Sequence, residues 1–195
     1  MSNRLFGERE KAMEEAYFRQ EDAKLLEKLR QNAKLDEIAV ALRDKLHVQN
    51  PELLRQVRSL GLPAEAAPAL FLAPLVQVAW ASGKVSSKQR GAVLRLARAR
   101  EIDEGSTAYA QLSEWLTNRP PDEVFRIAIE VLRSGFAVLP VIERQERIER
   151  VIDACNTVAM QSTGGVDQLV SLGNRVENQE TLMVQKMAAA LRKHV

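Results

Sequence analysis

Cysteine, histidine and aromatic residues are scarce in this chain, and each shortage excludes a class of site. Cys155 is the single cysteine, which rules out an internal disulfide and a zinc site built from several cysteines. His47 and His194 lie far apart, and neither has a ligand residue near it in sequence, so we interpret both as surface residues. Aromatic residues make up only 5% of the chain. With abundant Ala, Leu, Glu and Arg, this composition predicts an all-α fold.

Long apolar runs and a strong net charge are also missing. The longest stretch without polar side chains, residues 66–76, is short and contains Pro68 and Pro74, so we predict no transmembrane segment. The first residues lack the apolar core of a signal peptide. The 28 basic and 26 acidic residues nearly cancel, so the whole-molecule charge gives no reason to expect nucleic acid as a partner. We expect a cytoplasmic protein.

Two regions differ in their apolar pattern. Residues 1–33 are rich in both signs of charge and poor in apolar residues, which is typical of a solvated helical arm or of a helix that binds a partner. Residues 34–195 have apolar residues at helical spacing and predict a compact bundle of about seven to eight helices. The expected helices are 35–46, 51–60, 70–81, 87–99, 106–116, 122–134, 140–160 and 177–193, with a short piece at 166–172.

Residues 70–81 are apolar on nearly every side, with Gln77 as the one strongly polar side chain. Such a helix belongs in the centre of a bundle. Boundary signals surround the neighbouring helices: Asn50-Pro51 and Gly61 delimit one, Gly83 ends the central helix, and Ser86 or Ser87 caps the next. We assign these residues to the core: Trp80, Trp115, Val141, Ile148, Ile152, Cys155 and Ala159.

Two places in the chain are alike. Residues 78–85 and residues 158–176, after an insertion in the second, each contain a helix end, a glycine turn, a basic residue and a valine before a new helix. This echo predicts two helical hairpins packed against each other. Residues 66–191, and above all LVQVAWASGKVSSKQRGAVLRLARA at 75–99 and GNRVENQETLMVQKMAAAL at 173–191, resemble the TerB-like family of all-helical domains named for tellurite resistance.

The resemblance implies acidic residues that are associated with metal binding, one just before the turn glycine and one early in the following helix. Here Ser82 stands at the first place, and Lys88-Gln89 at the second. Only Glu180 remains at the corresponding place in the second hairpin. Because a hard divalent ion requires several carboxylate oxygens, we predict the fold without the metal site and without any other cofactor.

The arm has a resemblance of its own. Its segment FGEREKAMEEAYFRQEDAKLLEKLR, residues 6–30, is similar to the inhibitory segment of the mitochondrial ATP synthase inhibitor family. Aromatic residues on a polar helix also suit a groove on a partner, although Phe18 is better interpreted as packing on the chain's own bundle. The candidate partner-binding residues are Phe6, Arg9, Glu10, Glu14, Glu15, Tyr17, Phe18 and Arg19.

A second candidate surface is basic. Residues 66–100 contain no acidic residue, and Lys84, Lys88, Arg95 and Arg98 form a basic face. We favour a solvated face neutralised by acids from elsewhere in the chain. Phosphate, an anionic membrane, an acidic partner or the acidic residues of the arm are the alternatives. No aromatic residues alternate with these cations, which argues against nucleic acid.

No arrangement of residues predicts catalysis, because the carboxylates alternate with Lys or Arg as on a solvated surface. We therefore predict that the protein is not an enzyme. The first hypothesis is a TerB-like interaction module for a protein partner, linked through the resemblance to stress or tellurite resistance. The alternative is a regulator of a rotary ATP synthase that acts through its N-terminal helix.

Overall fold

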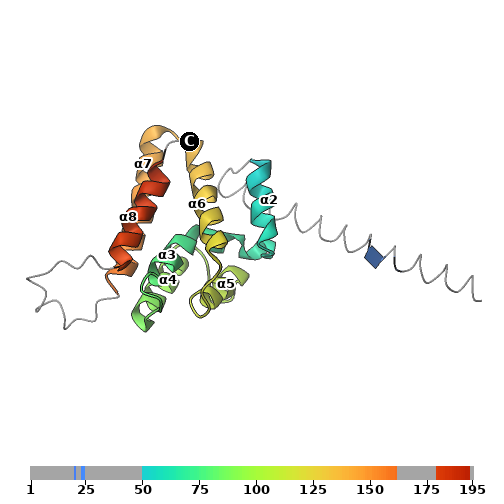
Figure 1. The fold of residues 1–195 in the computed structure, drawn as a ribbon, viewed down its shortest axis with the longest axis horizontal. Helices are drawn as coiled ribbons and strands as arrows, with labels where there is room; N and C mark the ends of the chain where they lie inside the picture. The colour runs from blue at the N-terminus through green and yellow to red at the C-terminus, as the bar shows by residue number, and fades with distance from the viewer. Residues whose placement is uncertain (1–19, 21–22, 25–49, 162–178, 194–195) are drawn as a thin grey trace, which may run out of the picture. The chain divides into compact units, whose positions relative to one another are not determined.

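A computed structural model of the chain describes residues 20, 23–24, 50–161 and 179–193. Apart from residues 20, 23 and 24, the predicted arm lies outside the described residues, as do the arm–bundle boundary, the helix at 35–46 and the piece at 166–172. All elements below belong to one unit, Ile38–Val195. The described part forms helices and no strand, which confirms the all-α fold (Figure 1): α2 (Pro51–Ser59), the 3₁₀ helix η1 (Ala64–Leu72), α3 (Ala73–Ala79), α4 (Ser87–Arg98), α5 (Thr107–Trp115), α6 (Asp122–Ala137), α7 (Val141–Ala159) and α8 (Gln179–Arg192).

The predicted boundary signals of α2 are confirmed. The Asn50 side chain accepts hydrogen bonds from the backbone N–H groups of Glu52 at 3.0 Å and Leu53 at 3.4 Å. Pro51 occupies the first turn, where its missing N–H costs nothing. Gly61 follows the helix with φ +67°, a left-handed conformation that other residues avoid.

The prediction of one helix over residues 70–81 is wrong in its bounds. Residues 64–72 form a 3₁₀ helix that contains Pro68, and α3 is confined to Ala73–Ala79 with Pro74 in its first turn. Proline has no N–H group, so neither proline can donate to the carbonyl four residues earlier in an α-helix. At the far end, Ala81 N–H donates to the Val78 carbonyl at 3.1 Å, a bond across three residues that ends the α-helical pattern.

The central position of the apolar segment is confirmed. Apart from Gln77, which is partly exposed, all the residues of α3 are buried. The helix contacts η1, α4, α5, α6, α7 and α8. Trp115 is buried, and the partly buried Trp80 donates its indole N–H to the Trp115 carbonyl at 2.8 Å.

The turn between α3 and α4 is built by local signals. Gly83 takes φ +85°. The Ser86 hydroxyl accepts from the Gln89 N–H at 3.1 Å, and the Gln89 side chain accepts from the Ser86 N–H at 2.9 Å. This reciprocal capping box fixes the first residue of α4 and confirms Ser86 as the cap.

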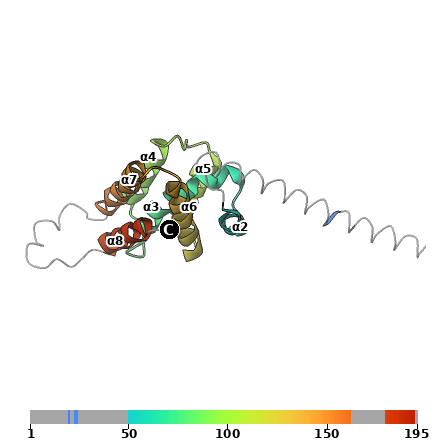
Figure 2. The same cartoon turned by 90° about the horizontal axis from the view of Figure 1, so that it is seen from above.

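The structure contains two helix pairs, α3 with α4 and α7 with α8, that pack on each other. Each pair is in contact internally, and α3 contacts both α7 and α8 while α4 contacts α7. Figure 2 shows α4 and α7 side by side at one edge of the bundle. Contact between the two helix pairs is therefore present, whereas the turn of the second predicted hairpin lies outside the described residues.

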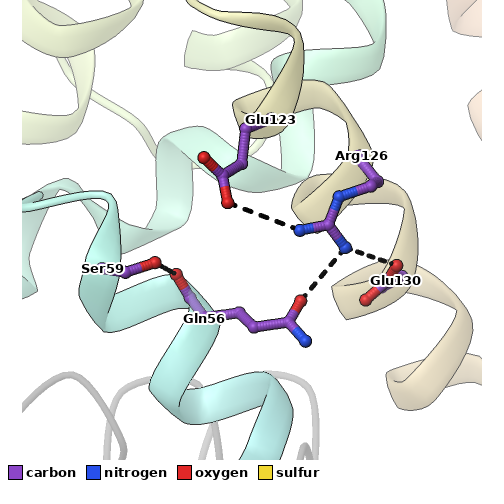
Figure 3. A network of polar contacts seen from close by, with 5 residues as sticks. All are labelled: Gln56, Ser59, Glu123, Arg126 and Glu130. Carbon is purple, nitrogen blue, oxygen red and sulfur yellow. Dashed lines mark hydrogen bonds and ion pairs between the residues drawn. The ribbon is translucent and has the colours of Figure 1, made fainter.

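Polar contacts join α2 to α6 (Figure 3). Arg126 donates to the side chains of Gln56 at 3.2 Å and Glu130 at 2.9 Å, and its guanidinium lies 3.5 Å from Glu123. Beneath this exposed network, Leu53 and Val57 of α2 are buried in the core. Because exposed ion pairs contribute little, the buried face of α2 supplies most of its attachment.

One predicted core residue is on the surface. Val141, the first residue of α7, is 64% exposed, whereas Ile148, seven residues later on the same face, is 6% exposed. Helical spacing places both residues on one side, but the first turn of α7 extends beyond the helices that cover Ile148. Ile152, Cys155 and Ala159 are buried as predicted.

No single described helix is both long enough and apolar enough to cross a membrane. The bent pair Pro51–Ser59 and Ala64–Ala79 passes that test only when its two parts are taken together, on length and composition alone.

Candidate functional site

The basic face predicted from the sequence is formed by α4 and the turn before it. Lys84 lies in the turn, and Lys88, Arg95 and Arg98 follow on the helix; all four side chains are exposed. Lys88 and Arg95 are seven residues apart and therefore lie on one side of α4, with Arg98 close to that side. The four residues thus lie on one capped helix and its preceding turn.

Arg98 differs from the other three cations of this face. It forms an ion pair with Glu104 at 2.9 Å, with the side chains 50% and 63% exposed. Lys84, Lys88 and Arg95 have no ion pair with any residue of the described chain. Neutralisation by acids elsewhere is therefore present for Arg98 alone within the described ranges.

Exposed arginines on the other helices are paired with carboxylates in the same part of the structure. The pairs are Arg55 with Glu52, Arg126 with Glu123 and Glu130, Arg147 with Glu143, Arg150 with Glu146, and Arg192 with Glu149. The face of α4 thus carries unpaired positive charge next to surfaces of balanced charge.

Arg90 belongs to the same basic segment but has a structural role. Its guanidinium donates to the Leu116 carbonyl at 2.7 Å, the Thr117 hydroxyl at 3.1 Å and the Ser113 carbonyl at 3.4 Å. The two carbonyls lie at the C-terminal end of α5, where the last carbonyl groups lack N–H partners within the helix, and the Ser113 carbonyl also accepts from the Thr117 hydroxyl at 2.8 Å. Arg90 therefore joins α4 to α5 and holds the basic face in place.

The described residues do not form a divalent-cation site of the kind that the TerB-like resemblance implies. Gln89 and Glu180 are both 1% exposed, and the Gln89 amide nitrogen lies 3.5 Å from a Glu180 carboxylate oxygen. The pair offers one carboxylate, and the Gln89 carbonyl already accepts from Ser86. Moreover, no group of three or more His, Cys, Asp or Glu residues suited to a metal occurs in the described ranges.

Cys155 is buried as predicted, and its thiol lies 3.9 Å from the sulfur of Met187. Burial raises the pKa of this thiol from 9.0 to about 12, and the Arg100 guanidinium acts weakly in the opposite direction. Since only the thiolate is a good nucleophile, Cys155 is a core residue without nucleophilic character at neutral pH.

The candidate partner-binding residues of the arm lie outside the described residues. They are Phe6, Arg9, Glu10, Glu14, Glu15, Tyr17, Phe18 and Arg19. His47 and His194 lie outside as well.

A cavity that sequence analysis did not predict lies where α6, α7 and α8 meet. Its volume is about 470 Å³, and the residues that line it come from positions 133–148 and 191–193. Val141 lies at its edge, and Val138 and Ile142, which are 60% and 75% exposed, belong to the same turn. The cluster of large aliphatic residues on both sides of Pro140 is the one feature of the sequence that marks this part of the chain.

Comparison with family models, curated proteins and solved structures gives no match for this chain. The TerB-like and inhibitor-like resemblances therefore stay predictions from the sequence.

Proposed function

We propose that the protein is a non-enzymatic, TerB-like interaction module, and that the basic face of α4 binds an acidic segment of a partner protein. The observation that supports this most directly is the set of three exposed cations, Lys84, Lys88 and Arg95, that have no ion pair within the described chain. Positive charge that is not neutralised within the molecule attracts a partner of opposite charge and orients it on approach.

The basic face is held rigidly, which favours binding because α4 does not have to become ordered when a partner binds. Ser86 and Gln89 cap α4, and Ala92, Val93 and Ala97 anchor its inner side in the core. Arg90 fixes the helix to the end of α5. A preorganised surface loses less conformational entropy on binding than a flexible one.

The chemistry of the face favours acidic protein over nucleic acid. Aromatic side chains that stack on bases do not alternate with the cations of α4. The near balance of charge over the whole chain also argues against a general polyanion binder. The link to stress or tellurite resistance comes only from the TerB-like resemblance.

The experiment measures the binding of a fluorescent glutamate-rich peptide by anisotropy at low salt. A triple variant, Lys84→Glu with Lys88→Glu and Arg95→Glu, is compared with a control, Arg55→Glu with Arg147→Glu and Arg150→Glu. Both change the net charge equally. We expect the α4 variant to lose at least about tenfold in affinity and the control to lose much less, because charge pairs in contact outweigh distant ones.

Equal losses in the two variants would contradict the proposal, because net charge alone would then explain the binding. Tighter binding to phosphatidylserine-containing vesicles than to the peptide would also contradict it, since the surface would then recognise a membrane.

A second candidate function, regulation of a rotary ATP synthase, is supported by the dense match of residues 6–30 to the inhibitor family. Its test is ATP hydrolysis by the cognate synthase with the full chain, with a variant that lacks residues 1–33, and with Tyr17→Ala. Inhibition by the full chain that both changes abolish would support it. The absence of inhibition by the full chain would eliminate it.

A further inference from the structure

The cavity between α6, α7 and α8 has the size of a ligand site. Its volume of about 470 Å³ lies within the range of about 300–1,000 Å³ that is usual for small-molecule pockets. The space between helices of a bundle is also a common place for such sites. In Figure 1, the α6–α7 turn and the end of α8 lie together at the top of the bundle, away from α4.

The inner wall of the cavity is apolar. Phe136 from α6, Ile148 from α7 and Leu191 from α8 line it and are 7%, 6% and 4% exposed. Val141 extends this wall to the surface. A hydrocarbon group bound here would be removed from water and would also cover exposed aliphatic side chains of the protein.

The charged residues that line the cavity are all basic: Arg133, Arg144, Arg192 and Lys193. No Asp or Glu from the described ranges lines it. Arg192 pairs with Glu149 at 2.7 Å, outside the lining, so its charge is partly balanced. The other three cations have no carboxylate partner within the described chain.

Arg133 has an unmet donor next to the cavity. One terminal nitrogen of its guanidinium donates to the Lys193 carbonyl at 3.2 Å. Its Nε atom is buried and has no hydrogen-bond acceptor among the described residues. Leaving a buried donor without an acceptor is costly, and an anion close to the guanidinium would reduce that cost.

The carbonyl groups at the end of α6 would repel an anion, but they are already bound. Arg144 donates to the carbonyls of Phe136 at 3.2 Å, Ala137 at 3.0 Å and Leu139 at 3.2 Å. This arginine neutralises the negative end of the helix dipole on the side of the cavity. The electrostatic character of the site is therefore positive.

We propose that this cavity binds a small anionic amphiphile, a hydrocarbon chain with a carboxylate head. The chain would contact Phe136, Ile148 and Leu191, and the carboxylate would lie at the basic edge near Arg133 and Lys193. The proposal does not depend on the basic face of α4, because it uses other helices and another end of the bundle.

The experiment titrates the full-length protein with dodecanoate, below its micelle concentration, by isothermal calorimetry. Dodecyltrimethylammonium, with the same chain and the opposite charge, is the ligand control. We expect dodecanoate to bind with a Kd below about 100 µM and the cationic amphiphile to bind at least tenfold more weakly.

Matched variants place the binding in the cavity. Val141→Glu puts a negative charge on an exposed residue of the lining, whereas Val138→Glu makes the same change on the same turn at a residue that does not line the cavity. We expect Val141→Glu to weaken binding at least tenfold and Val138→Glu to leave it within about twofold, because a contacting charge outweighs a distant one. Lys193→Glu, directly after α8, and Lys186→Glu, within α8, form a second such pair, because only Lys193 lines the cavity.

Several results would overturn the proposal. They are no binding of dodecanoate, equal binding of the two amphiphiles, or equal effects of Val141→Glu and Val138→Glu. Because the exposed residues do not support the core, circular dichroism of each variant should match the parent protein, and a variant that is unfolded is replaced by Lys193→Glu.

Discussion

At the scale of single residues, the core contains two polar features that the bundle tolerates rather than requires. Cys155 is a small apolar residue for packing purposes, since its thiol lies against Met187. Gln89 and Glu180 are buried together, and one Glu180 oxygen has no hydrogen-bond partner among the described residues. Both features should therefore affect the free energy of unfolding, in ways that substitutions can test.

Cys155 should make stability depend on pH in the alkaline range. Its pKa is raised on folding from 9.0 to about 12, so its contribution to stability is complete below pH 9 and is lost as the pH rises towards 12. Urea unfolding measures this effect. Over this window, the free energy of unfolding of the parent protein should fall by up to about 1.4 kcal/mol per pH unit more than that of Cys155→Ala. Equal pH dependence in the two proteins would contradict the assignment of a buried, neutral thiol.

Glu180→Gln should stabilise the protein. The change keeps the shape of the side chain and removes a buried negative charge whose second oxygen has no described partner. The complementary change Gln89→Glu would bring two carboxylates together and should cost about 1–3 kcal/mol. Urea denaturation at neutral pH measures both. If Glu180→Gln destabilises the fold by more than about 1 kcal/mol, the Glu180 carboxylate instead has a stabilising partner that glutamine cannot replace.

At the scale of elements, local sequence signals predicted where most helices begin and end. They did not predict which side chains other helices would cover. Asn50, Gly61 and Ser86 act where their chemistry places them. The 3₁₀ helix over residues 64–72 was missed because the predicted helix began at residue 70, after Pro68, whereas the 3₁₀ helix includes this proline. Val141 was misplaced because helical spacing identifies a face but does not show how far the neighbouring helices extend.

The basic face and the cavity also differ in how far the sequence predicts them. The exposure of the basic face could be predicted because its cations lie on one helix and its turn. The cavity could not, since it forms only where the end of α8, which is distant in sequence, packs beside the turn between α6 and α7.

The Gly83 turn should be sensitive to any side chain. Gly83→Ala should cost about 1–2 kcal/mol, because alanine is strained at φ +85°. The space around Gly83 is open, so steric clash adds nothing to this cost. Gly105→Ala is the matched control, since its surroundings are also open and its φ is not left-handed. Thermal unfolding compares the two; equal shifts in Tm would show that the turn conformation of Gly83 is not what limits stability.

At the scale of the whole molecule, the buried α3 organises two helix pairs and leaves two distinct surfaces at different ends. One is the rigid basic face of α4, and the other is the apolar, positively charged cavity beside the α6–α7 turn. The net charge of the whole chain, +2, gives no indication of the basic face of α4. Charge distribution, rather than total charge, therefore carries the functional argument.

Binding of an acidic partner segment to the basic face of α4 can be tested directly by site-specific photo-crosslinking in cells of the native host. A photoreactive amino acid replaces Lys88 on the basic face in one protein and Arg147 on α7 in a control, and mass spectrometry identifies the crosslinked peptides. The proposed interaction module should give adducts at position 88, in partner segments with more Asp and Glu than Lys and Arg, and far fewer at position 147. Equal adducts at the two positions, or adducts at position 88 in neutral or basic segments, would contradict it.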